Sequence, residues 1–221
     1  MFNKIRVFLQ LQKSILWNYG WLKSWWYNKP IDNEKQPLPW ITYPAIDFIK
    51  QFDFEHSRIF EWGSGNSTMW WSKRCKEIVS VESNANWYNL MKDKLPGNVK
   101  YLTCSIDLKE EMNLFLDSEG MYDVIVVDHN GTFRRECCRI APQKLNEGGL
   151  ILLDNSDQCL FATEELRKSG FQQIDFAGIA PSCSYAQTTS IFFKGKLKFS
   201  TIEKYQPVKS VAQPNNPWEN C

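Results

Sequence analysis

The sequence has few histidines and no long apolar run, and both shortages narrow what the protein can be. Only two histidines, His56 and His129, occur among its 221 residues, so few side chains can serve as a base that titrates near neutral pH. Near the N-terminus the apolar runs do not exceed three residues, whereas a helix that spans a bilayer needs about 20. No secretory signal is visible either. We therefore expect a cytoplasmic protein.

The cysteines and the charge balance exclude further classes. Seven cysteines are an odd number, and their positions lack the paired spacing of a structural metal site. We expect free thiols in a reducing compartment. The net charge of +1 gives no global bias toward nucleic acid. With 43% hydrophobic residues, the chain has enough apolar material for one globular core with appendages.

From Arg58 onward, short strand-like runs alternate with helical patterns, which is typical of a parallel sheet covered by helices on both faces. Strands are predicted at Arg58–Glu61, Glu77–Glu82, Val99–Thr103, Asp123–Asp128, Gly149–Asp154, Phe171–Ala177 and Thr188–Lys194. Helices are predicted between them at Ser67–Arg74, Ala85–Leu95, Lys109–Ser118, Phe133–Leu145 and Leu160–Lys168. The fourth and fifth strands are apolar on both faces, so they belong at the sheet centre. Only the loop over 178–187 joins the last two strands, which predicts an antiparallel hairpin at one edge.

The chain is predicted to have three parts: a basic aromatic segment over residues 1–45, a globular α/β domain over 46–195 and a flexible tail over 196–221. Up to Pro30 the chain carries no acidic residue, and its basic residues are Lys4, Arg6, Lys13, Lys23 and Lys29. Trp17, Trp21 and Trp25 recur at helical spacing. This pattern favours a helix that packs onto the domain through its aromatic stripe. The alternative is a helix within residues 1–30 that lies on an anionic membrane surface.

A glycine turn follows the first predicted strand, in the run Glu61-Trp-Gly-Ser-Gly65-Asn-Ser-Thr68. Such a turn between a strand and a helix is typical of nucleotide-binding loops, because glycine lets the main chain approach a ligand closely. A dinucleotide fingerprint would have Gly or Ala where Thr68 stands, so NAD is disfavoured. A carboxylate at Glu61 suits a cationic amino-acid group, which S-adenosylmethionine carries. The predicted cofactor contacts in this loop are Glu61, Gly63, Ser64, Gly65 and Ser67.

Three further side chains are candidates for the rest of the cofactor. Glu82 ends the second strand, 19 residues after Gly63, at the place where an acidic side chain accepts hydrogen bonds from ribose hydroxyls. Its alternative role is that of a surface glutamate before a helix cap. Ser105 and Asp107 follow the third strand and are candidates for contact with the adenine. Local turn chemistry explains them equally well.

Polar side chains also follow the two central strands. Asp128, Asp154 and Asn155 are expected to meet at the ligand edge of the sheet, where two carboxylates and an amide oxygen suit Mg²⁺ or a similar cation. The alternative is that Asp154 caps a helix and Asn155 belongs to a turn.

Asp128 and His129 are the candidate catalytic residues, with His129 either a base or a loop residue that shapes the pocket. One of the next two arginines is expected to serve an anionic substrate and the other to be solvated.

Four motifs in order resemble those of the class I S-adenosylmethionine-dependent methyltransferases, over roughly Trp40–Lys194. Their sequences are Glu61-Trp-Gly-Ser-Gly65, the ribose acid Glu82, Tyr122-Asp-Val-Ile-Val-Val-Asp128 and Leu145-Asn-Glu-Gly-Gly149. The resemblance implies a doubly wound, Rossmann-like, seven-stranded sheet with strand order 3-2-1-4-5-7-6 and an antiparallel last strand. It also implies that Asp128 lies between cofactor and acceptor.

Two finer resemblances concern the acceptor. Asp128, Asp154 and Asn155 are similar to the metal ligands of catechol O-methyltransferase-like enzymes, but Gly131 stands where that group has its lysine base. The runs around Trp40 and Asp154 resemble bacterial methyltransferase-like proteins, some of them associated with surface glycans. These resemblances imply O-methylation of a small-molecule, sugar or glycolipid hydroxyl. The alternatives are an NAD-dependent oxidoreductase and a non-catalytic binding module in a glycan-biosynthesis assembly.

Overall fold

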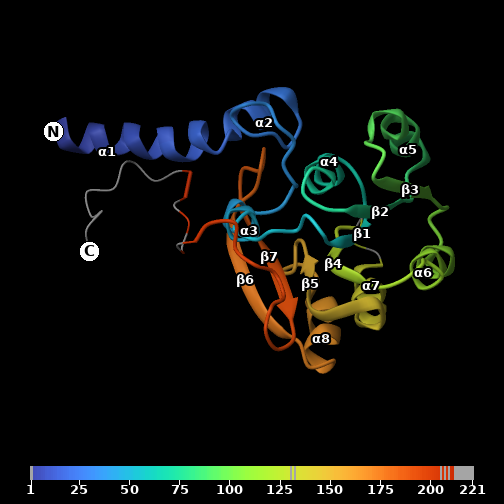
Figure 1. Ribbon diagram of the computed structural model, residues 1–221. Coiled ribbons are helices and arrows are strands. Elements are labelled where there is room, and N and C mark those ends of the chain that lie inside the picture. Colours follow the sequence, from blue (N-terminus) through green and yellow to red (C-terminus); the bar gives the residue numbers. More distant parts are fainter. Residues whose placement is uncertain are drawn as a thin grey trace.

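A seven-stranded sheet forms the centre of the protein, in the order β3-β2-β1-β4-β5-β7-β6 (Figure 1). The computed structural model describes residues 2–129, 131, 133–204, 206, 208, 210 and 211, without the side chain of residue 2. The strands are β1 (Arg58–Trp62), β2 (Glu77–Glu82), β3 (Val99–Thr103), β4 (Tyr122–Val127), β5 (Leu145–Leu153), β6 (Gln172–Ile179) and β7 (Ala186–Phe193). The first five strands pair in parallel, and β7 runs antiparallel to both β5 and β6. The predicted fold class and strand order are confirmed.

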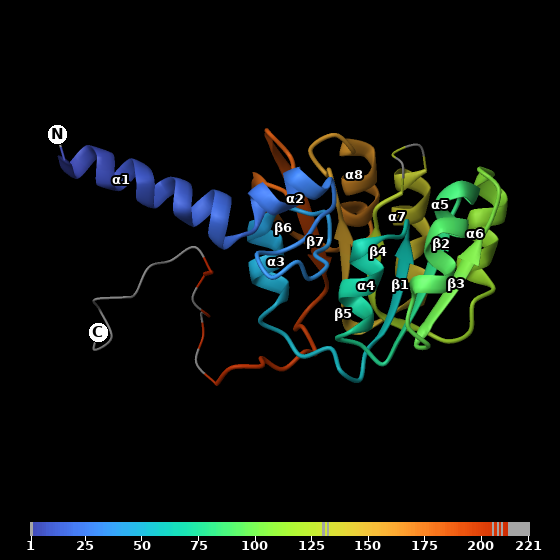
Figure 2. The same cartoon turned by 90° about the horizontal axis from the view of Figure 1, so that it is seen from above.

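Helices cover both faces of the sheet because its central strands are apolar on both sides. The helices are α1 (Phe2–Gln12), η1 (Lys13–Asn18, a π-helix), α2 (Trp21–Tyr27), α3 (Tyr43–Ile49), α4 (Asn66–Ser72), α5 (Ala85–Met91), η2 (Lys92–Lys94), α6 (Leu108–Leu116), α7 (Arg134–Ile140), η3 (Ala141–Lys144) and α8 (Leu160–Lys168). Successive residues of a strand face opposite sides, so Phe60 packs with α6, α7 and α8 while Ile59 packs with α3 and α4. Figure 2 shows these helices on the two sides of the sheet.

The largest boundary correction lies between α7 and β5. One helix was predicted over Phe133–Leu145, but α7 ends at Ile140, a short 3-10 helix follows, and β5 begins four residues before the predicted Gly149. The early start is possible because Gly149 packs tightly against β4, where an added Cβ would lie 2.7 Å from the carbonyl oxygen of Asp123. The pairing of β4 with β5 shifts register at the same place.

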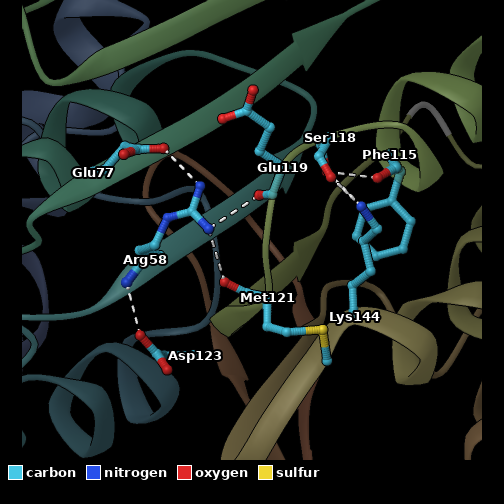
Figure 3. Close-up of polar contacts among 8 residues, drawn as sticks. All are labelled: Arg58, Glu77, Phe115, Ser118, Glu119, Met121, Asp123 and Lys144. Atoms are coloured by element: carbon cyan, nitrogen blue, oxygen red, sulfur yellow. Dashed lines mark hydrogen bonds and ion pairs between the residues drawn. The ribbon is translucent and has the colours of Figure 1, made fainter.

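Arg58 ties three strands together at the end of the sheet where the parallel strands begin, as Figure 3 shows. Its backbone N–H donates to Asp123 Oδ2 at 2.8 Å, and its guanidinium donates to Glu77 Oε1 at 2.9 Å. The guanidinium also reaches the carbonyl oxygens of Glu119 and Met121, at 3.0 and 3.2 Å. β1, β2 and the turn before β4 are therefore fixed relative to one another by one side chain.

Asp123 is the acceptor at the centre of this network. Its Oδ1 accepts hydrogen bonds from the Asn146 amide at 2.6 Å and from Lys198 at 2.5 Å. Burial alone would raise the pKa of Asp123, but Lys198, the Arg58 N–H and the Asn146 amide outweigh it and lower the pKa below its ordinary value. The carboxylate is thus kept charged and saturated with donors.

The N-terminal helices only partly pack onto the domain. Trp21 does pack, and its indole N–H donates to the carbonyl oxygen of Cys183 at 2.8 Å. Trp17 and Trp25 remain 54% and 56% exposed, so the three tryptophans do not form one buried stripe. α1 extends away from the domain in both views (Figures 1 and 2). Among the described residues, none of the helices has the length and apolarity required to cross a bilayer.

The six cysteines among the described residues are free thiols, and Cys221 lies outside that part of the chain. The predicted tail begins with residues that still contact the domain, because Thr201 forms an isolated bridge with Phe52. Most of the tail from residue 205 on lies outside the described residues, so its predicted flexibility stays a prediction.

Candidate functional site

The glycine loop joins β1 to α4 and adopts backbone angles that require glycine at two places. Gly63 has φ +94°, and an added Cβ would lie 2.6 Å from the carbonyl oxygen of Asp128. Gly65 has φ +152°. The first glycine therefore lets the loop pass directly against the end of β4, and any side chain there would push the loop away from the sheet.

Thr68 links the glycine loop to the buried Glu61. This role explains why the third position of the motif holds threonine instead of glycine or alanine. Its hydroxyl donates to Glu61 Oε2 at 2.5 Å and accepts the N–H of Gly65 at 3.0 Å. Glu61 is fully buried and also accepts from the Ser80 hydroxyl at 3.0 Å. Burial raises the pKa of Glu61 to about 7, although hydrogen bonds from Ser67, Thr68 and Ser80 favour the charged form. Glu61 thus supports the loop from the interior.

Glu82 lies beside the glycine loop rather than pointing into bulk water. Its Oε2 accepts the Ser64 hydroxyl at 2.6 Å, and its Oε1 accepts the backbone N–H of Asn84 at 2.8 Å. Ser64 also shares a 2.7 Å hydrogen bond with the Tyr101 hydroxyl. The end of β2 and the loop after β1 are therefore joined by hydrogen bonds. A nucleoside site in this fold uses these two segments together.

A cavity of about 520 Å³ opens over this loop, within the range of small-molecule sites. Its lining comes from the glycine loop, from α5 and from the N-terminal segment, and includes Ser64, Gly65, Ser67, Trp87, Lys29 and Asp128. The Trp87 indole N–H donates to the carbonyl oxygen of Ser64 at 3.0 Å. The Asn66 amide donates to the carbonyl oxygen of Pro30 at 2.7 Å. The N-terminal segment therefore forms one wall of the site.

A second, smaller cavity of about 230 Å³ shares Trp40 and Asp128 with the first. Its other lining residues are Asp154, Asn155, Cys183, Tyr185 and Gln187. Asp128 thus stands between a cavity over the glycine loop and a cavity between the ends of β4, β5 and the loop before β7. This arrangement has room for two ligands that meet at Asp128.

Arg134 lies among the polar groups that follow the two central strands. Its Nη2 donates to Asp128 Oδ1 at 3.0 Å, and its Nη1 donates to Asn155 Oδ1 at 3.0 Å and to the carbonyl oxygen of Asp154. The side chain is only 7% exposed. Arg135 instead pairs with Glu165 and is 54% exposed. One of the two arginines is solvated, as expected, whereas Arg134 binds Asp128, Asn155 and the main chain of Asp154.

These contacts do not fit the predicted divalent cation. Asp128, Asp154 and Asn155 do meet, but a guanidinium binds one carboxylate oxygen of Asp128, the amide oxygen of Asn155 and the backbone carbonyl oxygen of Asp154, and it already supplies a positive charge. Thr189 donates to Asp154 Oδ1 at 2.7 Å, which uses a further lone pair. Within the described residues, no group of three or more His, Cys, Asp or Glu side chains is arranged to hold a metal ion. The predicted metal site, and its likeness to that of catechol O-methyltransferase-like enzymes, are therefore not confirmed, and Arg134 instead bridges these residues.

Both aspartates hold a proton more tightly than usual. Burial raises the pKa of Asp154 to about 6, although Thr189 and Arg134 favour its charged form. Burial and the neighbouring Asp154 raise the pKa of Asp128 above its ordinary value, and Arg134 opposes them. Both carboxyl groups therefore take up a proton at a higher pH than an ordinary aspartate does.

His129 lies deeper than a catalytic base at a cavity wall. It is 4% exposed, its Nε2 lies 2.9 Å from the Glu111 carboxylate on α6, and its carbonyl oxygen accepts Arg134 Nε at 2.6 Å. Its ring stacks on Phe133, with 5.2 Å between centroids. These contacts favour a positioning role: His129 holds the segment that follows Asp128 and carries Arg134. Its assignment as base stays a prediction.

Ser105 and Asp107 are engaged in local turn contacts. Asp107 accepts the N–H of Glu110 at 2.8 Å and caps α6, while the Ser105 N–H donates to the Glu110 carboxylate at 3.1 Å. Neither residue lines the cavity over the glycine loop. Their predicted contact with an adenine ring stays untested.

Sequence reasoning missed Trp87 and Tyr101, which both contact Ser64. Trp87 follows the Asn84 cap of α5, whose side chain accepts the Trp87 N–H at 3.1 Å. That cap signal was visible in the sequence, but the direction of the indole was not. Tyr101 stacks on Tyr88, with 4.6 Å between centroids, and this pairing depends on how β3 lies beside α5.

Comparisons with known proteins give matches in structure only. No family model matches the chain, and no curated protein matches it in sequence. A precorrin-6y C5,15-methyltransferase from Geobacter metallireducens is similar over 69% of this chain and 87% of its own, with TM-score 0.56 and 17% identity. An O-methyltransferase from Bacillus cereus in complex with SAH matches over 69% and 79%, with TM-score 0.53 and 15% identity.

A third solved structure covers more of the chain. The O-methyltransferase TomG from Streptomyces achromogenes, involved in tomaymycin synthesis and in complex with SAM, matches over 83% of this chain and 88% of its own, with TM-score 0.52 and 12% identity. At such low identities these likenesses show a shared fold.

Proposed function

We propose that this protein is an S-adenosylmethionine-dependent methyltransferase that acts on an oxygen nucleophile. The observation that carries the proposal is the joined pair of Ser64 and Glu82, 2.6 Å apart, beside a cavity that ends at Asp128. The shared fold with O-methyltransferases that were solved in complex with SAM or SAH supports the same ligand.

The charges at this end of the sheet fit a ligand with a positive centre. Asp128 and Asp154 line the cavities, Glu61 and Glu82 accept hydrogen bonds from the glycine loop and its helix, and Arg134 contacts Asp128 and Asp154. Burial raises the pKa of Glu61 and of Asp154, and a neighbouring carboxylate adds a smaller contribution to each. When bound, S-adenosylmethionine would supply a methyl group on a positively charged sulfur, open to attack by oxygen.

The residues of the chain have separable roles in this proposal. Glu82 would accept hydrogen bonds from a ribose, and Ser64 and Gly65 would line the amino-acid end of the site. Asp128 would accept the proton of the acceptor's hydroxyl at its Oδ2, because Arg134 contacts Oδ1. Arg134 would keep the carboxylate oriented, and Trp40 and Tyr185 would shield the acceptor from water.

The acceptor is proposed to be a small molecule or a glycan hydroxyl. The smaller cavity is lined by amide and carboxylate groups of Asn155, Gln187 and Asp154 together with the ring of Tyr185. Together with Trp40, this mixture of hydrogen-bonding groups and two aromatic residues suits a polyhydroxylated ligand better than an apolar one.

Calorimetric titration with S-adenosylhomocysteine, with NAD as the control ligand, tests the cofactor assignment. We expect binding in the micromolar range for S-adenosylhomocysteine and none for NAD. Binding selective for NAD would replace the proposal with an oxidoreductase. A folded protein that binds neither ligand would replace it with a non-catalytic module.

The test of Asp128 needs an acceptor, which a screen for release of S-adenosylhomocysteine can identify. Asp128→Asn is expected to slow turnover about a hundredfold or more, because the amide cannot take up the hydroxyl proton. The variant should retain measurable affinity for S-adenosylhomocysteine. Unchanged turnover would remove Asp128 from the catalytic step.

A further inference from the structure

The N-terminal helices expose apolar side chains that the domain does not cover. Each of these side chains is between 47% and 75% exposed: Ile5, Val7, Phe8, Leu9, Leu11, Trp17, Trp25, Trp26 and Tyr27. By contrast, Trp62, Trp70 and Trp71 inside the domain are at most 2% exposed. Exposed apolar surface on this scale typically marks an interaction site.

The residues of α1 divide into two faces. A polar face carries residues spaced by three and four positions, namely Asn3, Arg6 and Gln10, and continues into Lys13 of η1. The remaining positions are mainly apolar, and they include Ile5, Val7, Phe8, Leu9 and Leu11. Residues 3–11 are all exposed, and α1 stands clear of the domain in both views (Figures 1 and 2). The apolar face therefore has no partner among the described residues.

The base of this helical arm is fixed to the domain. The Tyr19 hydroxyl donates to Asp47 Oδ2 at 2.6 Å, and its ring stacks on Tyr43 with 4.5 Å between centroids. The Trp21 indole N–H also donates to the carbonyl oxygen of Cys183 in the domain, at 2.8 Å. An arm held in this way presents its surface in a defined direction from the domain.

Charge identifies the kind of surface that fits the arm. Residues 1–30 carry five basic side chains and no acidic one, and the first carboxylate is Asp32. Lys4, Arg6 and Lys13 are exposed. A partner must therefore offer negative charge at its surface and an apolar interior directly beneath it, which is the composition of an anionic lipid bilayer.

We propose that the protein docks on anionic membranes through residues 2–27. The apolar face of α1 and the rings of Trp25 and Trp26 enter the boundary between headgroups and acyl chains, and the basic side chains contact the headgroups. A second copy of this chain is a poorer partner, because two arms with the same positive charge repel each other.

Docking would bring the cavity over the glycine loop close to the lipid surface, and with it the smaller acceptor cavity that shares Trp40 and Asp128. α2 ends at Tyr27, and the next residues, Asn28, Lys29 and Pro30, line the cavity over the glycine loop together with Gly65. An acceptor carried on a lipid could then reach the site without leaving the membrane. This consequence rests on the proposed methyl transfer, whereas the docking itself does not.

Co-sedimentation of the full chain with lipid vesicles tests the docking. We expect the protein to sediment with vesicles of equal parts phosphatidylglycerol and phosphatidylcholine, and to remain in solution with pure phosphatidylcholine. High salt should weaken the binding, because it screens the basic side chains. A chain that stays in solution with the anionic vesicles would overturn the proposal.

A matched pair of variants identifies the surface. Leu9→Asp is expected to lower the partition onto anionic vesicles about tenfold or more, because the variant would place a charge where the docked protein inserts a leucine into the bilayer. Leu160→Asp makes the same change at a side chain of similar exposure, 66% against 57%, on α8; it should partition like the unmodified chain. Equal loss in both variants would overturn the assignment to α1. A dimer that Leu9→Asp converts to a monomer, with no vesicle binding, would replace the membrane with a second copy.

Discussion

The two ends of the central sheet both join arginine to aspartate, but they treat charge in opposite ways. At the end where the parallel strands begin, Asp123 accepts hydrogen bonds from three donors and its pKa is lowered. At the other end, Arg134 binds the carboxylate of Asp128 and the backbone carbonyl oxygen of Asp154, and burial raises the pKa of both carboxyl groups. The first end stabilises the fold, whereas the second contains carboxyl groups that hold a proton more tightly than usual, a property that is common at functional sites.

Removal of the bridging arginine should have the largest effect. Arg134→Met is expected to cost about 3–5 kcal/mol in the free energy of unfolding, because two acidic groups lose a buried cation. Arg135→Met should leave stability nearly unchanged, since Arg135 is exposed and pairs at the surface. Denaturant unfolding at neutral pH measures both. Equal losses in the two variants would show that the buried contacts of Arg134 do not stabilise the fold more than the surface pair of Arg135 does.

The saturated end is tested by Asp123→Asn. The amide has one acceptor oxygen where the carboxylate has two, so the free energy of unfolding should fall by about 1–3 kcal/mol at neutral pH. Because the pKa of Asp123 is lowered in the folded state, its contribution is full above the unfolded pKa. The contribution disappears as pH falls below about 4. A difference from the unmodified chain that persists in acid would contradict this account. The affinity for S-adenosylhomocysteine should not change.

Glu61→Gln should show the opposite pH dependence. The folded chain holds the Glu61 proton up to a pKa of about 7, so ionisation of the buried group costs stability between its unfolded and folded pKa values. The glutamine variant avoids that cost. Relative to the unmodified chain, it should gain on the order of 2 kcal/mol as pH rises from 5 to 8. Thermal or denaturant unfolding over this pH range measures the gain, and a flat difference would disprove it.

The smallest expected effect is a change in ligand affinity that distinguishes the two ends of β2. Glu82→Gln should weaken the binding of S-adenosylhomocysteine about tenfold, because a charged acceptor for the ribose is lost. Glu77→Gln makes the same change at the start of β2, where the partner is Arg58, and should leave the affinity unchanged. Calorimetry with both variants gives the comparison. A matching loss in Glu77→Gln would show that Glu82 acts only through stability.

Much of the fold could be predicted because hydrophobic pattern acts locally. β2 and β3 have the predicted bounds, since each is a short run of strand-forming residues with a clear turn after it. The start of β5 was wrong by four residues. A strand that contains Gly148 and Gly149 carries little local signal, and only its packing against Asp123 makes it extended there.

The sequence predicted which residues would meet at the candidate site, but it did not predict the hydrogen bonds between them. Asp128, Asp154 and Asn155 do come together, because the ends of neighbouring parallel strands share one edge. That Arg134 would occupy the space between them could not be read from the sequence. Its position depends on how α7 begins after residue 133 and on the contact between its guanidinium and the carbonyl oxygen of His129.

The sequence by itself determined the α/β class, the central strands and the glycine loop. These features depend on residue periodicity and on backbone angles that only glycine adopts freely. The tertiary structure decided the partner of each buried charge and the exposure of the N-terminal arm. A carboxylate can bind a metal, an arginine or a ligand with the same oxygens, and only the distances set by packed strands and helices select among them.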